Sequence, residues 1–461
     1  MNRKSTMSRP VFFPDDLIVE IISLLAVKPL VRFKCVSNSW NTLISDPSFE
    51  KFHLKRTTRS GNTHFTLITQ HLTPIEGERS YHGDWSIIPY PITRLFHNPS
   101  STIVTDSSHY FLTDWDYPGS RFIGSCNGLL CLLYLDYSYT HDTYWFRLWN
   151  PATRKISQQF GYSHHSRSGF TFKFACDDST CTFKVVAYSF VQGRYTSQVK
   201  VFTIADNVWK NIDSFPIVPL AFEYQRWRSI WSDGCVFLNS TLNWLAIHKD
   251  IQKDLHNEYA PNFHSNWASL IRDITLDDLV IVSLHLGSET YNRFLLPKGF
   301  DELPPVEPTI SVLGEWLCFS YFHKGTDMVI WKMEKFGIQE SWIQFLKISY
   351  HVLRLYYDFS YNRLQLLPLF LSKDGDSLIL CRTTCDEGEA IIYNWKDNSA
   401  QRIEVNVHKT IIDDKNRNYL YMRFANGYVE SLISMKHSKL LVEETVKNHS
   451  TCFIRGLKRK Q

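Results

Sequence analysis

Apolar positions in the first part of the chain recur at the spacing of an α-helix. Pro14 and the two aspartates after it mark a helix start, because proline is tolerated in the first turn and acids favour the positive end of the helix dipole. Two sets of apolar residues follow at i, i+4 and i+7, offset by one position: Leu17, Ile21 and Leu24, and Ile18, Ile22 and Leu25. A helix that packs on one core needs a single apolar stripe. This helix has more apolar surface than one core explains.

The next residues predict two further short helices and a closing turn. Pro29 can start the second helix, and Ser37 is a suitable N-cap for the third. Asp46 and Pro47 begin another turn that bears phenylalanines. Three helices in roughly 40 residues have a marginal core of their own. Something else should therefore cover the surplus apolar surface, either a partner protein or the rest of this chain.

From about residue 110 the apolar positions alternate with period two, which predicts β-strands. One unit recurs, in which an alternating strand, a short polar turn and a second strand follow one another at 198–213, 280–297, 328–348 and 390–405. An aromatic residue lies next to each turn: Trp209, Tyr291, Trp342 and Trp395. Repeated units of roughly 50 residues with several strands each are typical of β-propeller blades.

These patterns predict an α+β, multidomain chain, since 461 residues exceed the size at which a single core stops growing. We expect a three-helix unit followed by an all-β, propeller-like domain. The residues between 247 and 278 should form an inserted surface loop with some helix. The predicted boundaries are 10–52 for the helical unit, 53–110 for a linker and the first strands, 111–440 for the β domain, and 441–461 for a basic tail.

The charge distribution bears on the class of partner. Residues 1–60 hold ten Lys and Arg against five Asp and Glu, and the tail from Lys447 holds five Lys and Arg with no acid. Within a total of +4, the body between them therefore has a net charge of −6. Phosphate binding needs clustered cations, so we expect no nucleic-acid ligand. The acidic body weakly favours a partner with a basic surface.

The chain has no membrane-length apolar run. We expect no secretory leader, because two acids precede the first apolar run. We expect no membrane association. Without a secretory route the ten cysteines should be reduced and mostly buried. These features predict a cytoplasmic or nuclear protein. The basic tail GLKRKQ is either a weak nuclear-import signal or a solvated chain end.

Catalytic and metal-binding motifs are weak. Gly124 to Gly128 match the spacing of a nucleophile elbow with Cys126 at its centre, but a strand follows where that motif needs a helix. Asn127-Gly128 is better explained as a tight hairpin turn. The pairs Cys176/Cys181 and Cys381/Cys385 lack a second set of zinc ligands at suitable spacing. We therefore predict no catalytic residues, no metal site and no cofactor.

Residues 13–49, FPDDLIVEIISLLAVKPLVRFKCVSNSWNTLISDPSF, resemble an F-box. The family pattern is an apolar residue and Pro, Asp-x-Leu, a Leu/Ile-rich helix, a Lys-x-Leu-x-Arg turn, Val-x-x-x-Trp and a closing Pro-x-Phe. The corresponding positions are Phe13-Pro14, Asp15 to Leu17, Val19 to Leu25, Lys28 to Arg32, Val36 to Trp40, and Pro47 to Phe49. The family more often has Leu at the position of Phe13 and frequently has Pro at the position of Ala26. Both residues keep an apolar side chain at these positions.

The β domain is similar to the F-box-associated domain of the large plant F-box families, some of which are described as kelch-like. The phrases that support this resemblance are GSCNGLLCL (124–132), LWNPATRK (148–155) and VSLHLGSETYNRFLLP (282–297). The Gly-Gly doublet of kelch repeats is absent, because no two of the 19 glycines are adjacent. That absence leaves the number of blades open.

The resemblance implies the substrate-recognition subunit of a Skp–cullin–F-box (SCF) ubiquitin ligase. The F-box would dock onto a Skp-type adaptor and through it onto a cullin, and the β domain would bind a protein target of unknown identity. By position, the residues implied to contact the adaptor or to support that contact are Phe13, Pro14, Leu17, Ile21, Leu30, Val36 and Trp40. Two alternatives remain, a β-propeller enzyme such as a hydrolase and an adaptor-bound scaffold that transfers no ubiquitin.

Overall fold

A computed structural model describes most of the chain. The described residues are 14–59, 63–74, 81–97, 102–104, 110–112, 121–137, 141–166, 170–190, 197–220, 234–247, 267, 271–272, 274–355, 366–383, 388–403, 406–408, 419–435 and 443–445. Phe13, most of the predicted insertion at 247–278 and most of the basic tail lie outside them. No helix among the described residues is both long and apolar enough to cross a membrane.

Four helices form the N-terminal unit, which we call the head: α1 (Asp15–Ile22), α2 (Val27–Phe33), α3 (Asn38–Ile44) and α4 (Pro47–Arg59). The first three confirm the predicted short helices, and the Ser37 side chain accepts the Trp40 amide at 3.2 Å as the predicted N-cap of α3. The last helix is longer than the single turn expected from the sequence. Asp46 caps it by accepting the Ser48 amide at 2.8 Å.

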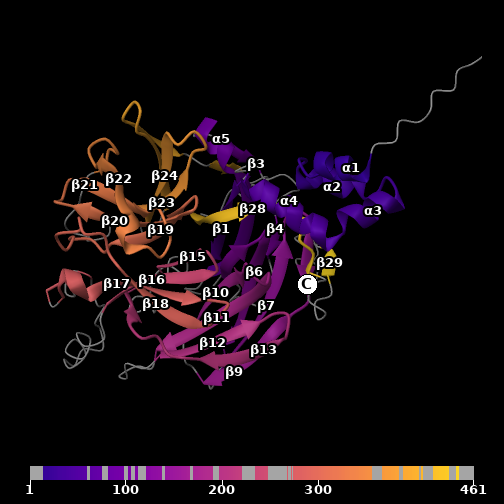
Figure 1. Cartoon of the computed structure of the whole chain (residues 1–461), viewed down its shortest axis with the longest axis horizontal. Helices are drawn as coiled ribbons and strands as arrows, with labels where there is room; N and C mark the ends of the chain where they lie inside the picture. The colour runs from indigo at the N-terminus through magenta and orange to yellow at the C-terminus, as the bar shows by residue number, and fades with distance from the viewer. Residues whose placement is uncertain are drawn as a thin grey trace, which may run out of the picture.

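Six sheets of four or more strands make up most of the remaining described chain (Figure 1). Blade 1 contains β5 (Arg121–Cys126), β6 (Leu129–Tyr137), β7 (His141–Asn150), β8 (Lys155–Ser157) and β9 (Phe160–Ser166). Blade 2 contains β10 (Thr171–Asp177), β11 (Thr182–Phe190), β12 (Ser197–Thr203) and β13 (Val208–Ile212). Blade 3 contains β14 (Val218–Pro219), β15 (Cys235–Leu238), β16 (Thr241–Ile247), β17 (Leu279–His285) and β18 (Thr290–Leu295).

The next two blades are plain four-stranded antiparallel sheets. Blade 4 contains β19 (Thr309–Leu313), β20 (Trp316–His323), β21 (Asp327–Met333) and β22 (Trp342–Ser349). Blade 5 contains β23 (Leu366–Leu371), β24 (Ser377–Thr383), β25 (Gly388–Asn394) and β26 (Ser399–Ile403). The predicted strand–turn–strand units are the hairpins β12–β13, β17–β18, β21–β22 and β25–β26, so the sequence repeat corresponds to the last two strands of each of these blades.

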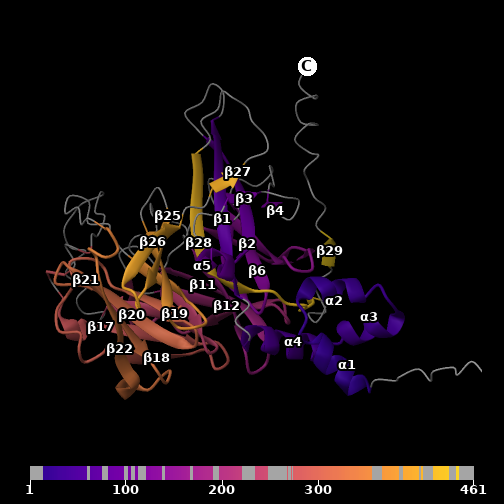
Figure 2. The same ribbon diagram turned by 90° about the horizontal axis from the view of Figure 1, so that it is seen from above.

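Blade 6 joins the two ends of the chain. Its strand order is β28 (Tyr419–Val429), β1 (Thr63–Pro74), β2 (Tyr81–Pro91) and β4 (Tyr110–Leu112), so a C-terminal strand pairs with strands from the N-terminal part. The short helix α5 (Ile92–His97) follows β2. Residues 53–110, expected to hold a linker and the first strands, thus contribute β1 and β2 to this sheet. In Figure 2 the long strands β1, β2 and β28 project away from the helices of the head.

The remaining short elements lie at the edges of these sheets. β3 (Thr102–Val104) pairs in parallel with β27 (Asn406–His408), and β29 (Glu443–Thr445) pairs with β8 of blade 1. The 3₁₀ turns η2 (Leu276–Asp278) and η3 (Gln339–Ser341) precede β17 and β22. β29 lies beyond residue 440, where the sequence suggested only a tail.

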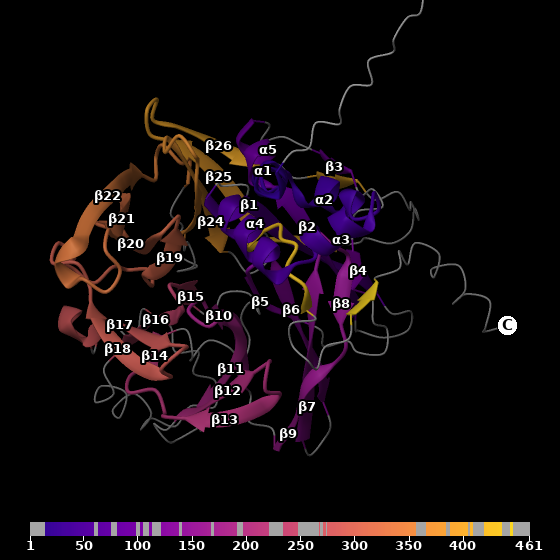
Figure 3. The same cartoon turned by 45° about the vertical axis from the view of Figure 1, so that its right-hand side comes forward.

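The sheets follow one another around a ring (Figure 3). β5 packs against β10, β19 lies against both β15 and β23, and β28 lies against both β25 and β5. Shared apolar clusters fill the spaces between blades 1 and 2, 2 and 3, 3 and 4, and 4 and 5. This arrangement is the propeller-like all-β domain predicted from the strand repeat, and it is closed by blade 6.

One face of the ring lies against the head. The chain passes from β28 directly into residues that contact the helices, and Ala152 in the β7–β8 turn packs against the head's core. Gly124 of β5 lies beside Phe174 of β10, and Cys126 lies beside Cys176, so the two strands run in the same direction. The β5–β6 and β10–β11 turns, which follow these strands, therefore lie on the same face. We call this face the near face and the opposite one the far face.

The aromatic residues of the sequence repeat connect neighbouring blades. The Trp209 indole donates to the Gly161 carbonyl at 3.3 Å, and the Trp342 indole donates to the Leu295 carbonyl at 3.2 Å. The Tyr291 hydroxyl likewise donates to the Asp213 carbonyl at 3.0 Å. In each case an outer strand donates a hydrogen bond to the backbone of the preceding blade. The repeat therefore ties each of these blades to the one before it.

Trp395 differs from the other three, and it lies before its turn and not after it. Its ring meets Phe345 of the preceding blade edge-on, with centroids 5.8 Å apart. The contact is an aromatic pair. Blade 5 is thus held to blade 4 by packing at the point where the other blades use a hydrogen bond.

Replacing Tyr291 with Phe removes only the hydroxyl of this inter-blade bond. We expect Tyr291→Phe to destabilise the chain by about 1 kcal/mol, the usual net value of such a bond. Urea unfolding followed by circular dichroism measures this as a lower midpoint with an unchanged slope. The matched control is Tyr162→Phe, which removes a hydroxyl that donates to Gln159 at an exposed position within blade 1 and should shift the midpoint much less. Equal midpoints for the Tyr291→Phe and natural chains would contradict the role given to the repeat.

Candidate functional site

The helices of the head enclose a small core. Its buried apolar residues are Ile22, Val27, Leu30, Ile44 and Phe49. Leu30, one of the residues implied to act in adaptor binding, is fully buried here. It can therefore support a contact surface from beneath but does not itself reach the surface.

An apolar strip remains exposed on the outside of the head. Leu17, Ile21 and Leu24 form one stripe along α1 and its C-terminal turn, with exposed fractions of 50, 56 and 74%. Val36, after α2, is 67% exposed. Exposed apolar residues that follow one stripe of a helix are typical of a protein–protein contact. Leu24 is absent from the set that the resemblance implied, although its i+7 spacing from Leu17 already placed it in this stripe.

Two further predicted residues lie at the ends of helices. Pro14 is exposed and begins α1, where its carbonyl accepts the amides of Leu17 and Ile18 at 3.0 and 3.2 Å. The half-buried Trp40 meets Phe33 edge-on, with ring centroids 5.3 Å apart. This pair fixes α3 against α2, so Trp40 supports the head while keeping part of its ring accessible.

Polar contacts join α4 to α1 and the turn after it. Arg56 pairs with the Glu20 carboxylate at 2.5 Å and also donates to the Glu20 carbonyl at 3.0 Å. The buried His53 ring contacts the Leu25 carbonyl through Nε2 at 2.8 Å. Burial lowers the pKa of His53, and the bond to Leu25 acts in the opposite direction. These contacts hold the apolar strip on a preformed support.

The inner side of the head is covered by the propeller. Leu432, which follows β28, is 2% exposed and belongs to the head's core cluster, and Ala152 packs beside it. The buried Glu50 carboxylate accepts the Ser434 amide at 3.0 Å. The sequence left two candidates for covering the surplus apolar surface, the rest of this chain and a partner protein. The chain's own body covers one side, and the strip on α1 is left exposed.

Cys126 lies in a hairpin and not in a nucleophile elbow. Asn127 and Gly128 form the two-residue turn between β5 and β6, both with positive φ, as expected for an Asn-Gly hairpin. The buried Cys126 thiol lies 2.8 Å from that of Cys176. The hydrogen bond with Cys126 is the largest influence on the pKa of Cys176, which it raises together with burial. A raised pKa makes the Cys176 thiol a poor nucleophile, and Cys126 itself is buried in the hairpin.

The two cysteine pairs considered as zinc ligands, Cys176/Cys181 and Cys381/Cys385, form no zinc centre within the part of the chain that the structure describes. Cys176 is buried and Cys181 is exposed, and Cys385 lies outside the described residues. No group of three or more His, Cys, Asp or Glu side chains among the described residues could hold a metal ion.

Comparison with known proteins agrees with this arrangement. A family model described as the F-box domain matches residues 13–52, and one described as the F-box associated beta propeller domain matches residues 95–435. An F-box/kelch-repeat protein of Arabidopsis thaliana is 26% identical over 359 residues, which span 74% of this chain and 81% of that protein. F-box protein CPR1 of the same plant is 21% identical over 80% of this chain and 79% of its own length.

Solved structures resemble the chain only distantly. The β-propeller domain of the Trilobed protease from Pyrococcus furiosus aligns with a TM-score of 0.32 at 8% identity, over 66% of this chain and 82% of that one. A putative 6-phosphogluconolactonase from Bacteroides uniformis aligns with a TM-score of 0.34 at 11% identity, over 83% and 97%. Scores this low support no conclusion about function.

The thiols predict a clear pattern of chemical reactivity. Cys126, Cys131 and Cys176 are buried, and burial also raises the pKa of Cys131, so iodoacetamide should not modify these residues in the folded chain at neutral pH. Cys35 and Cys181 are exposed and provide the matched positive controls in the same sample. Peptide mass spectrometry measures both groups. Modification of Cys126 as fast as that of Cys35 would revive the nucleophile interpretation.

Proposed function

The chain belongs to the F-box proteins with an F-box-associated β-propeller domain, and on this premise we propose that it is the target-recognition subunit of a Skp–cullin–F-box ubiquitin ligase. The head would bind a Skp-type adaptor, which in turn links to a cullin. The propeller would bind the protein that receives ubiquitin. Such a subunit would act in the cytoplasm or the nucleus.

The observation that supports adaptor docking best is the exposed strip of Leu17, Ile21, Leu24 and Val36. Burying a large aliphatic side chain stabilises a complex by roughly 1.5–3 kcal/mol. The stripe of Leu17, Ile21 and Leu24, together with the exposed Val36, therefore offers several such side chains to a partner helix or groove. Pro14 and Trp40 flank this surface, and Leu30 supports it from the core. Phe13, which precedes Pro14 in the sequence, lies outside the described residues and remains a predicted contact.

The far face of the propeller is the surface we assign to target recognition. The longest connections between strands leave from this face, because β16 and β22 both run away from the head. One joins Ile247 to Leu279, and another joins Ser349 to Leu366. Loops on a rigid scaffold are where binding residues concentrate. The net charge of −6 on the body favours a target with a basic surface.

In this proposal the chain performs no covalent chemistry and needs no cofactor. It contributes by holding a target near the ubiquitin-conjugating enzyme, which raises the effective concentration of the target's lysines. Neither nucleic acid nor a membrane takes part. A scaffold that binds the adaptor without ubiquitin transfer uses the same head surface, so only a transfer assay separates the two functions.

Placing a charge in the exposed strip should abolish adaptor binding. We expect Leu17→Asp and Ile21→Asp to weaken the binding of full-length chain to a recombinant Skp-type adaptor at least tenfold, or roughly 1.4 kcal/mol or more. Isothermal calorimetry measures the affinity, and circular dichroism shows whether each variant is folded. The matched control is Leu295→Asp, since Leu295 is also 50% exposed but lies on blade 3. Unchanged binding by the head variants, or no binding by the natural chain, would refute adaptor docking at this strip.

Ubiquitin transfer requires a target, which proximity labelling during proteasome inhibition can supply. In a reconstituted ligase the natural chain should promote modification of a captured target. Leu17→Asp should reduce that modification to the level seen without the chain. A target that binds the chain in the assembled ligase but is never modified would favour the scaffold function.

A further inference from the structure

The residues after β28 link the head and the propeller. We call residues 430–435 the return segment, because it leads the chain from the closing blade back to the N-terminal helices. Neighbouring residues of this segment contact both bodies. Leu432 and the Ser434 amide contact the head, whereas Ser431, Ile433 and Met435 contact the propeller.

On the head side, the return segment completes the core. Leu432 is almost fully buried against the helices, in the same cluster as Leu30 and Phe49. The Ser434 amide donates to the buried carboxylate of Glu50 on α4 at 3.0 Å. A buried carboxylate is costly unless it accepts hydrogen bonds, so Glu50 favours the orientation in which this amide reaches it.

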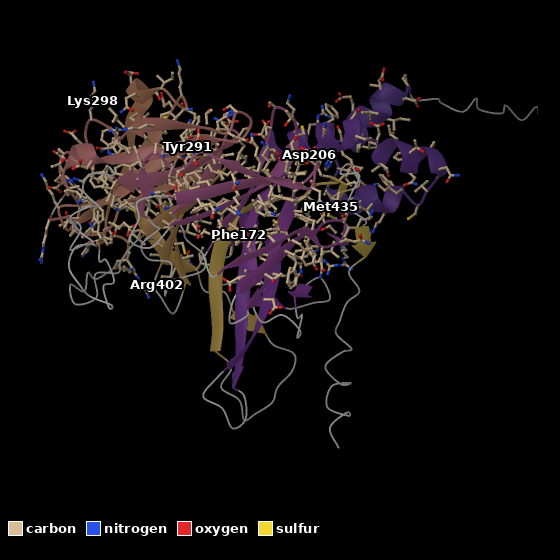
Figure 4. All side chains as sticks on the ribbon, turned by 90° about the horizontal axis from the view of Figure 1, so that it is seen from below. Phe172, Asp206, Tyr291, Lys298, Arg402 and Met435 are labelled. Atoms are coloured by element: carbon tan, nitrogen blue, oxygen red, sulfur yellow. The ribbon has the colours of Figure 1, made fainter. Side chains whose placement is uncertain are left out.

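On the propeller side, the same residues are fixed to blade 1. The buried Asn150 side chain donates to the carbonyls of Ser431 and Ile433, both at 3.1 Å. The Ser431 hydroxyl donates to the Asn127 carbonyl at 2.9 Å. Met435 belongs to the core between blades 1 and 2, as does Phe172 (both labelled in Figure 4). The segment therefore has little freedom to move relative to the ring.

The only covalent connection between head and propeller runs through residues 60–62, from α4 to β1. Thr63 of β1 pairs with Val429 of β28, so the covalent connection and the return segment meet the head at the same end of blade 6. Two smaller contacts also join the bodies: Ala152 of blade 1 packs against the head's core, and Leu54 of α4 packs against the core between blades 1 and 2. The return segment adds a fully enclosed apolar side chain and a hydrogen bond to a buried carboxylate, and these favour one orientation of the head.

We propose that the return segment sets the orientation of the head on the propeller, with Leu432, Glu50 and Asn150 as positioning residues. The functional role of this orientation rests on the proposed function. If the head is fixed on the propeller, a target bound at the far face has a fixed position relative to the adaptor. The orientation itself is a property of the free chain and can be measured without any partner.

Distance measurements between head and propeller test this directly. Spin labels are introduced in the full chain through a non-natural ketone amino acid at Lys51 of α4 and Lys335 after β21, both exposed. Double electron–electron resonance should give one narrow distance distribution for the otherwise natural chain. We expect Leu432→Ala and Asn150→Ala each to widen that distribution at least twofold. Asn150 lies outside the head, so Asn150→Ala removes no side chain from the head's core cluster.

Two controls separate positioning from general destabilisation. Leu378→Ala removes the same atoms from the fully buried core of blade 5, away from the return segment, and should keep the narrow distribution. Glu50→Gln retains an oxygen that can accept the Ser434 amide and should also keep it. Calorimetric binding of a Skp-type adaptor by each variant reports whether the head is still folded.

The outcomes are distinct. If Asn150→Ala gives the same narrow distribution as the natural chain, the return segment does not set the orientation. If Leu378→Ala widens the distribution as much as Asn150→Ala, the effect is unspecific and the proposal fails. If Asn150→Ala widens the distance distribution and Leu378→Ala does not, the positioning role is supported even if no adaptor binds. Absence of adaptor binding by the natural chain would instead refute the proposed function.

Discussion

The burial of Leu432 in the helical head is the interaction on which the rest of the structure depends. A group of four helices within residues 14–59 is too small to build an ample core alone. This head takes one core residue, Leu432, from the far end of the sequence, and Ala152 of blade 1 packs against that core. Because Leu432 directly follows the closing strand, the head cannot complete its core unless the propeller is closed.

This shared core explains why the first helix is apolar on more than one side. Its inner side and those of its neighbours pack on one another and on Leu432, and contacts from α4 through Arg56 and His53 hold the arrangement together. The outer stripe has no such cover within the described chain. The apolar residues of the head thus form two surfaces. One is buried within the head and against Leu432, and the other, on the outside of α1, is available to a partner.

Local signals in the sequence were sufficient for most individual elements. Period-3.6 apolar spacing and the Ser37 cap predicted the short helices, and alternating strands with polar turns predicted four hairpins. Contacts between distant segments left no such signal. The pairing of β1 with β28 and the bond from Ser434 to Glu50 each join residues more than 340 positions apart, so no periodicity within one window could reveal them. Leu30 and Leu17 likewise look alike in sequence, and only packing separates core from surface.

Hydrogen exchange on the full-length chain, with and without a Skp-type adaptor, tests the central claim most directly. In the free chain the Ser434 amide should already exchange slowly, because it is bonded to the buried Glu50 carboxylate. Adding the adaptor should slow exchange in residues 17–24 and 34–36 and leave the amides of the six blades unchanged. Rapid exchange at Ser434 in the free chain, or protection that appears on the propeller and not on α1, would contradict the account.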